Sequence, residues 1–130
     1  MENASGEADI IRPVREQLAA YDAKDIDRFM QWWADDCQYY AFPSELLGDG
    51  AKQIRERHVE RFKEPNLHGR LVQRMVVGNL VADREVVTRN FPDGLGEVDV
   101  LAIYEVKAGR TVCARFKFGE RKMGCQDNAR

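Results

Sequence analysis

The order of the hydrophobic patterns is the feature that most constrains how this chain folds. Apolar residues recur at helical spacing through residues 10–63, interrupted by one short extended run at residues 37–42. From residue 71 onward, strand-like alternation takes over. Because the helices precede the strands instead of alternating with them, the pattern predicts an α+β fold and not a doubly wound parallel sheet.

Length and charge narrow the class of protein. The 130 residues are 44% hydrophobic and 32% charged, which is typical of one globular domain. Twenty basic and 22 acidic side chains give a net charge of −2, which argues against nucleic-acid binding. We expect a frayed or disordered N-terminus at residues 1–9, a single domain at residues 10–122 and a flexible tail at residues 123–130. No apolar run predicts a membrane span or a signal peptide, and three widely spaced cysteines favour a cytoplasmic location.

Three helices are predicted in the first half of the chain. The first is expected to begin near Arg12, because Pro13 suits the first turn of a helix. Asp25 is a predicted N-cap for a second, short helix. The third covers residues 51–63 and carries His58 on its apolar stripe.

The strands are predicted to form an antiparallel meander. They are expected at residues 37–42, 71–81 and 85–91 and in a long hairpin over residues 97–118. Turns are predicted at residues 48–50, at Asp83-Arg84 and at residues 92–96.

The last hairpin can be assigned a register. A three-residue loop ending at Gly109 pairs Tyr104 with Val112 and Val100 with Phe116. The opposite face has an apolar middle, which a fully solvated face should lack. We therefore expect a homodimer through the outer sheet face, although a few exposed apolar residues need no partner. The expected interface residues are Leu101, Ile103, Cys113 and Arg115.

Two segments of the chain resemble a known superfamily. Residues 18–27 with 33–36 resemble the opening of the nuclear-transport-factor-two-like superfamily, which includes SnoaL-like polyketide cyclases and steroid Δ-isomerases. Residues 114–120 resemble the final strand of the bacterial ketosteroid isomerases. The resemblance covers residues 10–122 and implies three N-terminal helices packed in a curved antiparallel sheet, a cone or cystatin-like roll with an internal cavity.

The isomerase residues do not carry over. At the positions that match that family's catalytic tyrosine, base and oxyanion-binding aspartate, this chain has Gln17, Ala41 (or Phe42) and Ala102. The Arg-x-Asp pair of the limonene epoxide hydrolases is also missing from the predicted sheet strands. If the chain is an enzyme, the resemblance implies an isomerase or lyase-like reaction with no cofactor, and not by the standard isomerase mechanism.

Three residues are the candidates for chemistry. His58 lies on a predicted buried stripe and could act as a general base, while Arg89 or Tyr104 could steady a developing oxyanion. The alternatives are that His58 is a core histidine satisfied by a tyrosine hydroxyl or a backbone carbonyl, and that Arg89 points outward. We expect His58 to hydrogen-bond to one of Gln17, Tyr21 or Tyr39.

The remaining cavity candidates are mostly aromatic, as is usual for a small-molecule site. They are Gln17, Tyr21, Trp33, Tyr39, Ala41, Phe42, Phe62, Phe91, Ala102, Phe116 and Phe118. Acids are expected to be scarce on the inner faces, and Glu45 near the mouth is the only one retained as a candidate. No metal site is expected, since His58 and His68 lack partners at ligand spacing.

Two functions stay open. The first is an isomerase, cyclase or dehydratase that acts on a small apolar or aromatic, ring-containing ligand. The second is a non-catalytic ligand-binding or dimeric assembly module of the same fold. No nucleic-acid or membrane partner is expected in either case.

Overall fold

The computed structural model describes residues 2–124 and consists of three helices and a six-stranded sheet. The elements in chain order are α1 (Glu2–Ala23), α2 (Ile26–Met30), β1 (Trp33–Ala41), β2 (Glu45–Asp49), α3 (Ala51–Arg61), β3 (His68–Val77), β4 (Leu80–Phe91), β5 (Gly94–Lys107) and β6 (Arg110–Met123). The α+β class and the three helices are therefore confirmed.

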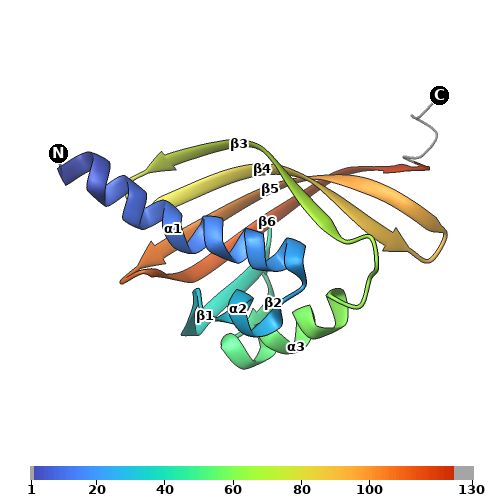
Figure 1. Ribbon diagram of the computed structural model, residues 1–130, viewed down its shortest axis with the longest axis horizontal. Coiled ribbons are helices and arrows are strands. Elements are labelled where there is room, and N and C mark those ends of the chain that lie inside the picture. The colour runs from blue at the N-terminus through green and yellow to red at the C-terminus, as the bar shows by residue number, and fades with distance from the viewer. Residues whose placement is uncertain (1, 125–130) are drawn as a thin grey trace.

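The sheet is curved, and the helices lie on one side of it (Figure 1). Its strand order is β2-β1-β6-β5-β4-β3, and every neighbouring pair is antiparallel except β1 and β6, which are parallel. Helix α1 packs against β3, β4, β5 and β6, whereas α3 packs against β1 and β2. The site therefore lies between the concave sheet face and the helices.

Helix α1 begins at Glu2 and not near Arg12, so Pro13 lies inside it. The proline lacks the N–H that would bond to the carbonyl of Asp9. Asp9 is exposed, so water can satisfy that carbonyl, and the proline ring itself is buried. The division into terminus, domain and tail stays a prediction, and Met1 and residues 125–130 lie outside the described residues.

Helices α2 and α3 follow their sequence signals. The Asp25 side chain accepts a hydrogen bond from the backbone N–H of Arg28 at 3.2 Å, so the predicted N-cap is confirmed. The turn predicted at residues 48–50 is instead the end of strand β2, which pairs with β1. Gly50 then begins α3 with a φ of 92°, a conformation that favours glycine.

The first hairpin of the meander turns earlier than expected. Val77 pairs with Leu80 around Gly78-Asn79, and Gly78 has a φ of 58°. Glycine followed by asparagine suits a two-residue hairpin turn because both tolerate positive φ. The predicted turn at Asp83-Arg84 is therefore wrong, and these residues lie in the middle of β4.

The final hairpin also has a tighter turn than expected. Ala108 and Gly109 form a two-residue connection with φ values of 51° and 78°, and a bulge follows it. The expected three-residue loop and its register are therefore wrong by two residues. The pairs are Tyr104–Ala114, Ala102–Phe116 and Val100–Phe118. Because a two-residue shift preserves side-chain alternation, the same residues still face inward.

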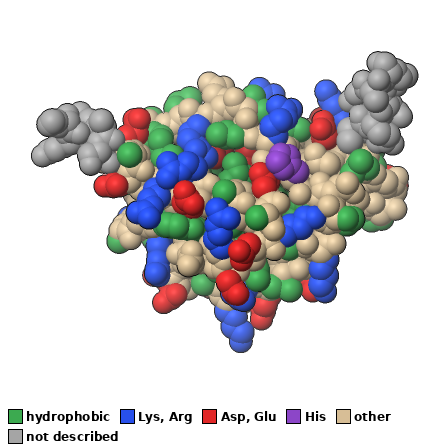
Figure 2. Space-filling view, in the orientation of Figure 1, with side chains coloured by type: hydrophobic (Ala, Val, Ile, Leu, Met, Phe, Trp, Pro, Cys, Tyr) green, Lys and Arg blue, Asp and Glu red, His purple; other side chains and the backbone are tan. Residues whose placement is uncertain are grey.

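The surface carries charges of both signs. On the face shown in Figure 2, basic and acidic side chains are interspersed with hydrophobic ones. None of the helices within residues 2–124 is long and apolar enough to cross a membrane.

A buried ion pair joins β3 to β4. Asp83 has no exposed surface and accepts two hydrogen bonds from Arg74, at 2.7 and 2.8 Å. This fork is the favourable geometry for a guanidinium and a carboxylate. Removing one partner of such a pair leaves an uncompensated buried charge.

We expect Asp83→Ala to lower the free energy of unfolding by about 3 kcal/mol or more, measured by urea denaturation. The double variant Asp83→Leu/Arg74→Met should recover much of this loss, because an apolar pair leaves no buried charge unpaired. The control is Arg84→Ala, which breaks the exposed pair with Asp99 on the other face of the strand and should change little. Equal losses in Asp83→Ala and Arg84→Ala would contradict the prediction.

Candidate functional site

A cavity lies between the helices and the concave face of the sheet. It and its mouth contain about 530 Å³ that no atom fills, of which the centres of water-sized molecules can reach about 50 Å³. The cavity is therefore narrow. Its wall is formed by Gln17, Leu18, Tyr21, Phe29, Trp33, Tyr39, His58, Arg61, Glu85, Val87, Arg89, Val98, Val100, Tyr104, Phe116 and Phe118.

Aromatic rings make up much of the wall. Tyr39 on β1 stacks on Phe116 of β6 with ring centroids 4.5 Å apart, and Tyr104 of β5 meets Phe116 edge-on at 5.8 Å. The ring centroids of Trp33 and Tyr39 lie 6.0 Å apart. These packed rings offer an apolar surface that suits a ring-shaped molecule.

His58 is a buried histidine whose partner is its own helix. The ring is 3% exposed, and Nδ1 lies 2.8 Å from the carbonyl oxygen of Ile54, to which it donates. The pKa of His58 is lowered to about 4, mainly by burial and also by the nearby cations of Arg61 and Arg57, against the opposing effect of the Ile54 hydrogen bond. The imidazole is therefore neutral at pH 7, with Nε2 unprotonated, and binds a proton weakly.

The expected hydrogen bond from His58 to Gln17, Tyr21 or Tyr39 is replaced by the bond to Ile54. The tyrosine rings instead meet the imidazole edge-on, at centroid distances of 6.3 Å for Tyr21 and 5.5 Å for Tyr39. The geometry matches the alternative interpretation, a core histidine satisfied by a backbone carbonyl.

Glu85 is an acid in the cavity wall that the sequence reasoning missed. Its residue surface is 6% exposed, and its Oε2 atom has no hydrogen-bond partner among the described residues. The pKa of Glu85 is raised to about 8, mainly by burial and also by the nearby charge of Asp83, against the opposing effect of Arg74. The carboxyl is therefore largely protonated at pH 7.

The misplaced turn left the direction of this strand face open. Alternation within the predicted strand at residues 85–91 puts Glu85 on the same face as Arg89, but that face was not fixed as inward. With the turn at Gly78-Asn79, strict alternation places Val81, Asp83, Glu85 and Val87 on the buried face. The expectation that inner faces are poor in acids is therefore wrong. In the structure, Gly69 on β3 leaves room for this carboxyl, because an added Cβ would lie 3.3 Å from Oε1 of Glu85.

Tyr104 and Gln17 form a polar contact in the wall. The Gln17 side-chain amide donates to the hydroxyl of Tyr104 at 3.4 Å and to the carbonyl of Val14 at 3.1 Å. Burial raises the pKa of Tyr104 well above its usual value, and Glu85 and Asp83 raise it further. The phenol therefore keeps its proton and can donate it in a hydrogen bond.

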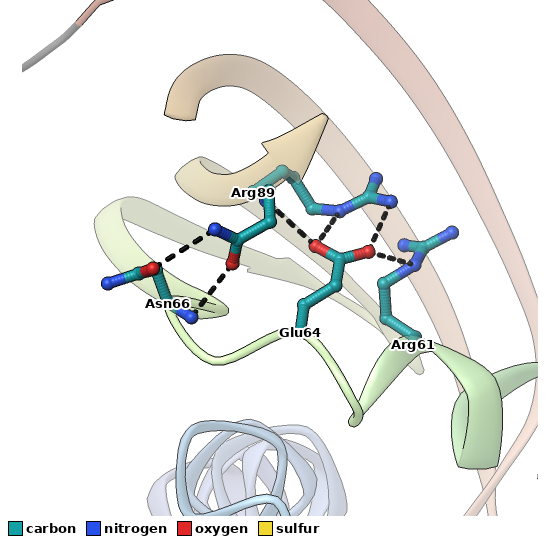
Figure 3. Close-up of polar contacts among 5 residues, drawn as sticks. Arg61, Glu64, Asn66 and Arg89 are labelled. Carbon is teal, nitrogen blue, oxygen red and sulfur yellow. Dashed lines mark hydrogen bonds and ion pairs between the residues drawn. The ribbon is translucent and has the colours of Figure 1, made fainter. Parts of the chain in front are cut away.

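Arg89 lines the cavity, but its guanidinium group is already paired with the carboxylate of Glu64. Two hydrogen bonds of 2.8 Å join the fork of Arg89 to both oxygens of Glu64, which also accepts from the Asn90 backbone at 3.0 Å. Nε of Arg61 lies 3.7 Å from the same carboxylate. Figure 3 shows Glu64 between the two arginines. These contacts outweigh the effect of burial and lower the pKa of Glu64.

The other predicted wall residues divide into two groups. Those that line the cavity are Gln17, Tyr21, Trp33, Tyr39, Phe116 and Phe118. Those placed outside its lining are Ala41, Phe42, Phe62, Phe91 and Ala102. Ala102 is buried in the core, and the ring of Phe62 packs on Tyr21 and Phe29. Phe91 lies beneath the guanidinium of Arg121, and Phe42 is exposed.

The predicted interface and ligand residues outside the cavity are placed as follows. Leu101 is 40% exposed, Ile103 and Arg115 are half-buried, and Cys113 is buried. Glu45 is exposed at the start of β2. Within residues 2–124 there is no group of three side chains able to hold a metal ion.

The raised pKa of Glu85 predicts a pH-dependent stability. Folded Glu85 keeps its proton up to about pH 8, whereas an unfolded glutamate releases it near pH 4.5, so stability falls as pH rises between these values. Glu85→Gln should abolish this loss and exceed the parent protein in free energy of unfolding by roughly 4 kcal/mol at pH 9.

The matched control for this prediction is Glu120→Gln, at an exposed position of β6. Urea denaturation from pH 5 to pH 9 measures the difference. A constant difference between Glu85→Gln and the parent across this range would contradict the prediction.

Among known proteins, no curated sequence matches the chain well enough to count as a relative. An uncharacterized cystatin fold protein from Novosphingobium aromaticivorans has a TM-score of 0.76 at 24% identity, over 82% of this chain and 96% of that one. An LEH-like epoxide hydrolase from M. tuberculosis has a TM-score of 0.74 at 18% identity, over 86% and 84%.

A third structure, a putative ketosteroid isomerase from Kribbella flavida, has a TM-score of 0.74 at 15% identity, over 87% of this chain and 79% of that one. At these identities the likeness establishes the fold alone. The family model of the SnoaL-like domain matches residues 14–114, which is most of the chain. The chain therefore belongs to the SnoaL-like domain family.

Proposed function

We propose that this protein is a cofactor-independent acid–base enzyme, an isomerase, cyclase or dehydratase, that acts on a small apolar, ring-containing molecule. The observation that carries the proposal is Glu85, a buried carboxyl in the cavity wall whose Oε2 has no hydrogen-bond partner within residues 2–124. The aromatic rings around it supply the apolar surface. Two structural neighbours, a putative ketosteroid isomerase and an LEH-like epoxide hydrolase, are consistent with small-molecule chemistry in such a cone.

Glu85 is a better proton carrier than His58 in this site. A group transfers protons most effectively when its pKa lies near the working pH. The pKa of Glu85 is raised to about 8, whereas that of His58 is lowered to about 4. The proposal therefore assigns proton transfer to Glu85 and leaves His58 as a packed, neutral part of the wall.

In an isomerisation, the ionised form of Glu85 would remove a proton from a carbon next to a carbonyl group. The C–H electron pair becomes a new C=C bond while the π pair of the carbonyl group moves onto its oxygen, which gives an enolate. Where this enolate is conjugated with a second C=C bond, Glu85 then returns the proton to the far carbon of the conjugated system. The protonated hydroxyl of Tyr104 can donate to the enolate oxygen, as an oxyanion-hole donor does. The step is balanced and needs no co-reactant.

Proton exchange tests this assignment without knowledge of the natural substrate. Cyclohexanone and 1-indanone in D₂O should lose α-proton NMR signal faster with the protein than without it. Glu85→Gln should reduce this catalysed rate by about a hundredfold or more, because general-base catalysis contributes 10² or more. Tyr104→Phe should reduce it less steeply, by about tenfold to a hundredfold.

The control is Glu120→Gln, an exposed acid far along β6, which should keep the full rate. Ketone binding is measured in parallel by chemical-shift perturbation. Ketone binding without exchange, or an equal rate in Glu85→Gln, would exclude the assignment.

The alternative is a ligand-binding module without catalysis. The narrow cavity and the residues Gln17, Ala41 and Ala102 at the isomerase catalytic positions favour it. Its signature in the same experiment is a bound ketone that does not exchange.

We also propose that two copies pair through the outer sheet face. A row of apolar side chains crosses this face, and the described helices contact the opposite face. This apolar row on the outer face includes Met75, Leu80, Leu101 and Ile103, with Met75 57% and Leu101 40% exposed. A second copy could cover this row, and paired arginines and acids such as Arg84 and Asp99 beside it suit a self-complementary contact.

Sedimentation velocity at micromolar concentration should therefore give a dimer. Leu101→Lys should shift the protein to a monomer because it places a charge in the apolar row, whereas Lys117→Gln nearby should leave the dimer intact. A monomeric parent protein would contradict the proposal.

A cytoplasmic location remains part of the proposal. Cys37 and Cys113 are free thiols, which is usual in a reducing compartment.

A further inference from the structure

The cavity has a basic edge that the proposed proton transfer does not use. Its guanidinium groups are those of Arg57 and Arg61, one turn apart at the end of α3, and of Arg89 on β4. Arg61 and Arg89 line the cavity, and Arg57 lies over the ring of Tyr39, with its central carbon 5.3 Å from the ring centroid. One carboxylate, that of Glu64, lies against Arg61 and Arg89.

Glu64 satisfies Arg89 far better than it satisfies Arg61. Arg89 holds it with two hydrogen bonds of 2.8 Å. Arg61 reaches it only at 3.7 Å, which is an ion pair but too long for a hydrogen bond. A guanidinium has five N–H donors, so most of the donor capacity of Arg61 remains unused by Glu64.

The surroundings keep this edge positively charged. The arginine side chains are mostly covered, with exposed fractions of 21% for Arg61 and 20% for Arg89. Nε of Arg57 is buried and has no hydrogen-bond partner among the described residues. Glu60 is exposed and pairs with Lys63, so it does not neutralise the cluster. Three cations against one anion in a partly dry site favour the entry of another anion.

We propose that Arg61, supported by Arg89, binds the carboxylate of a small organic acid whose apolar ring enters the aromatic cavity. Glu64 acts as an internal competitor because it occupies the fork of Arg89 when no ligand is bound. The inference rests on the proposed small-molecule function for its occupant, and it names the substrate class of that site. A planar carboxylate matches the guanidinium fork, and the ring matches Tyr39 and Phe116 behind it.

Calorimetry with benzoate tests the site directly, with its neutral analogue benzamide and with inorganic phosphate as the other two arms. Benzoate should bind at least tenfold more tightly than benzamide, because only the acid makes charge-assisted hydrogen bonds. Arg61→Gln should weaken benzoate binding by about tenfold or more, and Arg61→Lys should recover only part of it, because lysine keeps the charge and loses the fork. The control is Arg55→Gln on the exposed face of α3, which should change nothing.

Glu64→Gln gives the sharpest result, since the two explanations of this ion pair predict opposite signs. If Glu64 competes with the ligand, its neutralisation should tighten benzoate binding several-fold. If the pair only braces the loop, the same change should weaken binding or leave it unchanged. Circular dichroism and thermal unfolding confirm that each variant is folded before its affinity is compared.

The inference is overturned by equal affinity for benzoate and benzamide, by equal effects of Arg61→Gln and Arg55→Gln, or by weaker or unchanged binding in Glu64→Gln. It is also overturned if phosphate binds as tightly as benzoate with the same dependence on Arg61, because the ring then contributes nothing. The exchange of neutral ketone protons by Glu85 requires no carboxylate. Exchange without benzoate binding would therefore refute this inference and leave the proposed function standing, and benzoate binding without exchange would do the reverse.

Discussion

Burial of charge on the inner face of strand β4 is the constraint on which the rest of the site depends. Asp83, Glu85 and Arg89 alternate with outward residues and point into the interior. An isolated charge is costly there, and each residue meets that cost differently. Asp83 accepts two hydrogen bonds from Arg74, and Arg89 donates two hydrogen bonds to Glu64. Glu85 instead remains protonated and therefore neutral. The first two solutions hold neighbouring elements together, whereas the third leaves a proton available in the cavity.

The same constraint explains why Glu85 is unusual among the acids of this chain. Asp99, on the outer face, pairs with Arg84 in solvent, and this pair lowers the pKa of Asp99. Glu64 has two guanidiniums beside it, which lower its pKa. Glu85 lies between Asp83 and Asp22, whose negative charges add to the effect of burial, and Arg74 is already engaged by Asp83. A protonated carboxyl is therefore the favoured state, and its position in the wall makes it useful.

Sequence patterns specified the elements better than their registers. Helical and alternating spacing gave the α+β class and the three helices, because those periods depend on local geometry. The turn at Gly78-Asn79 and the bulge after Ala108-Gly109 depend on single residues, and misplacing the turn left the inward direction of Asp83 and Glu85 unassigned. The final hairpin kept its correct inner residues because an even shift preserves the faces. The burial of His58 was predictable from its stripe, but its partner was not, because the Ile54 carbonyl one turn earlier competes with every tertiary partner.

The cavity has an electrostatic axis that limits what can occupy it. Glu85 and Arg89 lie on the same face of β4, four residues apart, which corresponds to about 13 Å along a strand. The acidic end is neutral when Glu85 is protonated, and the opposite end is positive because Arg57 and Arg61 add to Arg89. A ligand anchored by a carboxylate at the basic end would place its far atoms toward Glu85, with its rings against the stacked pair of Tyr39 and Phe116. Such a molecule needs more than one ring to reach both ends, so the length of the axis, and not the volume of the cavity alone, would select among substrates.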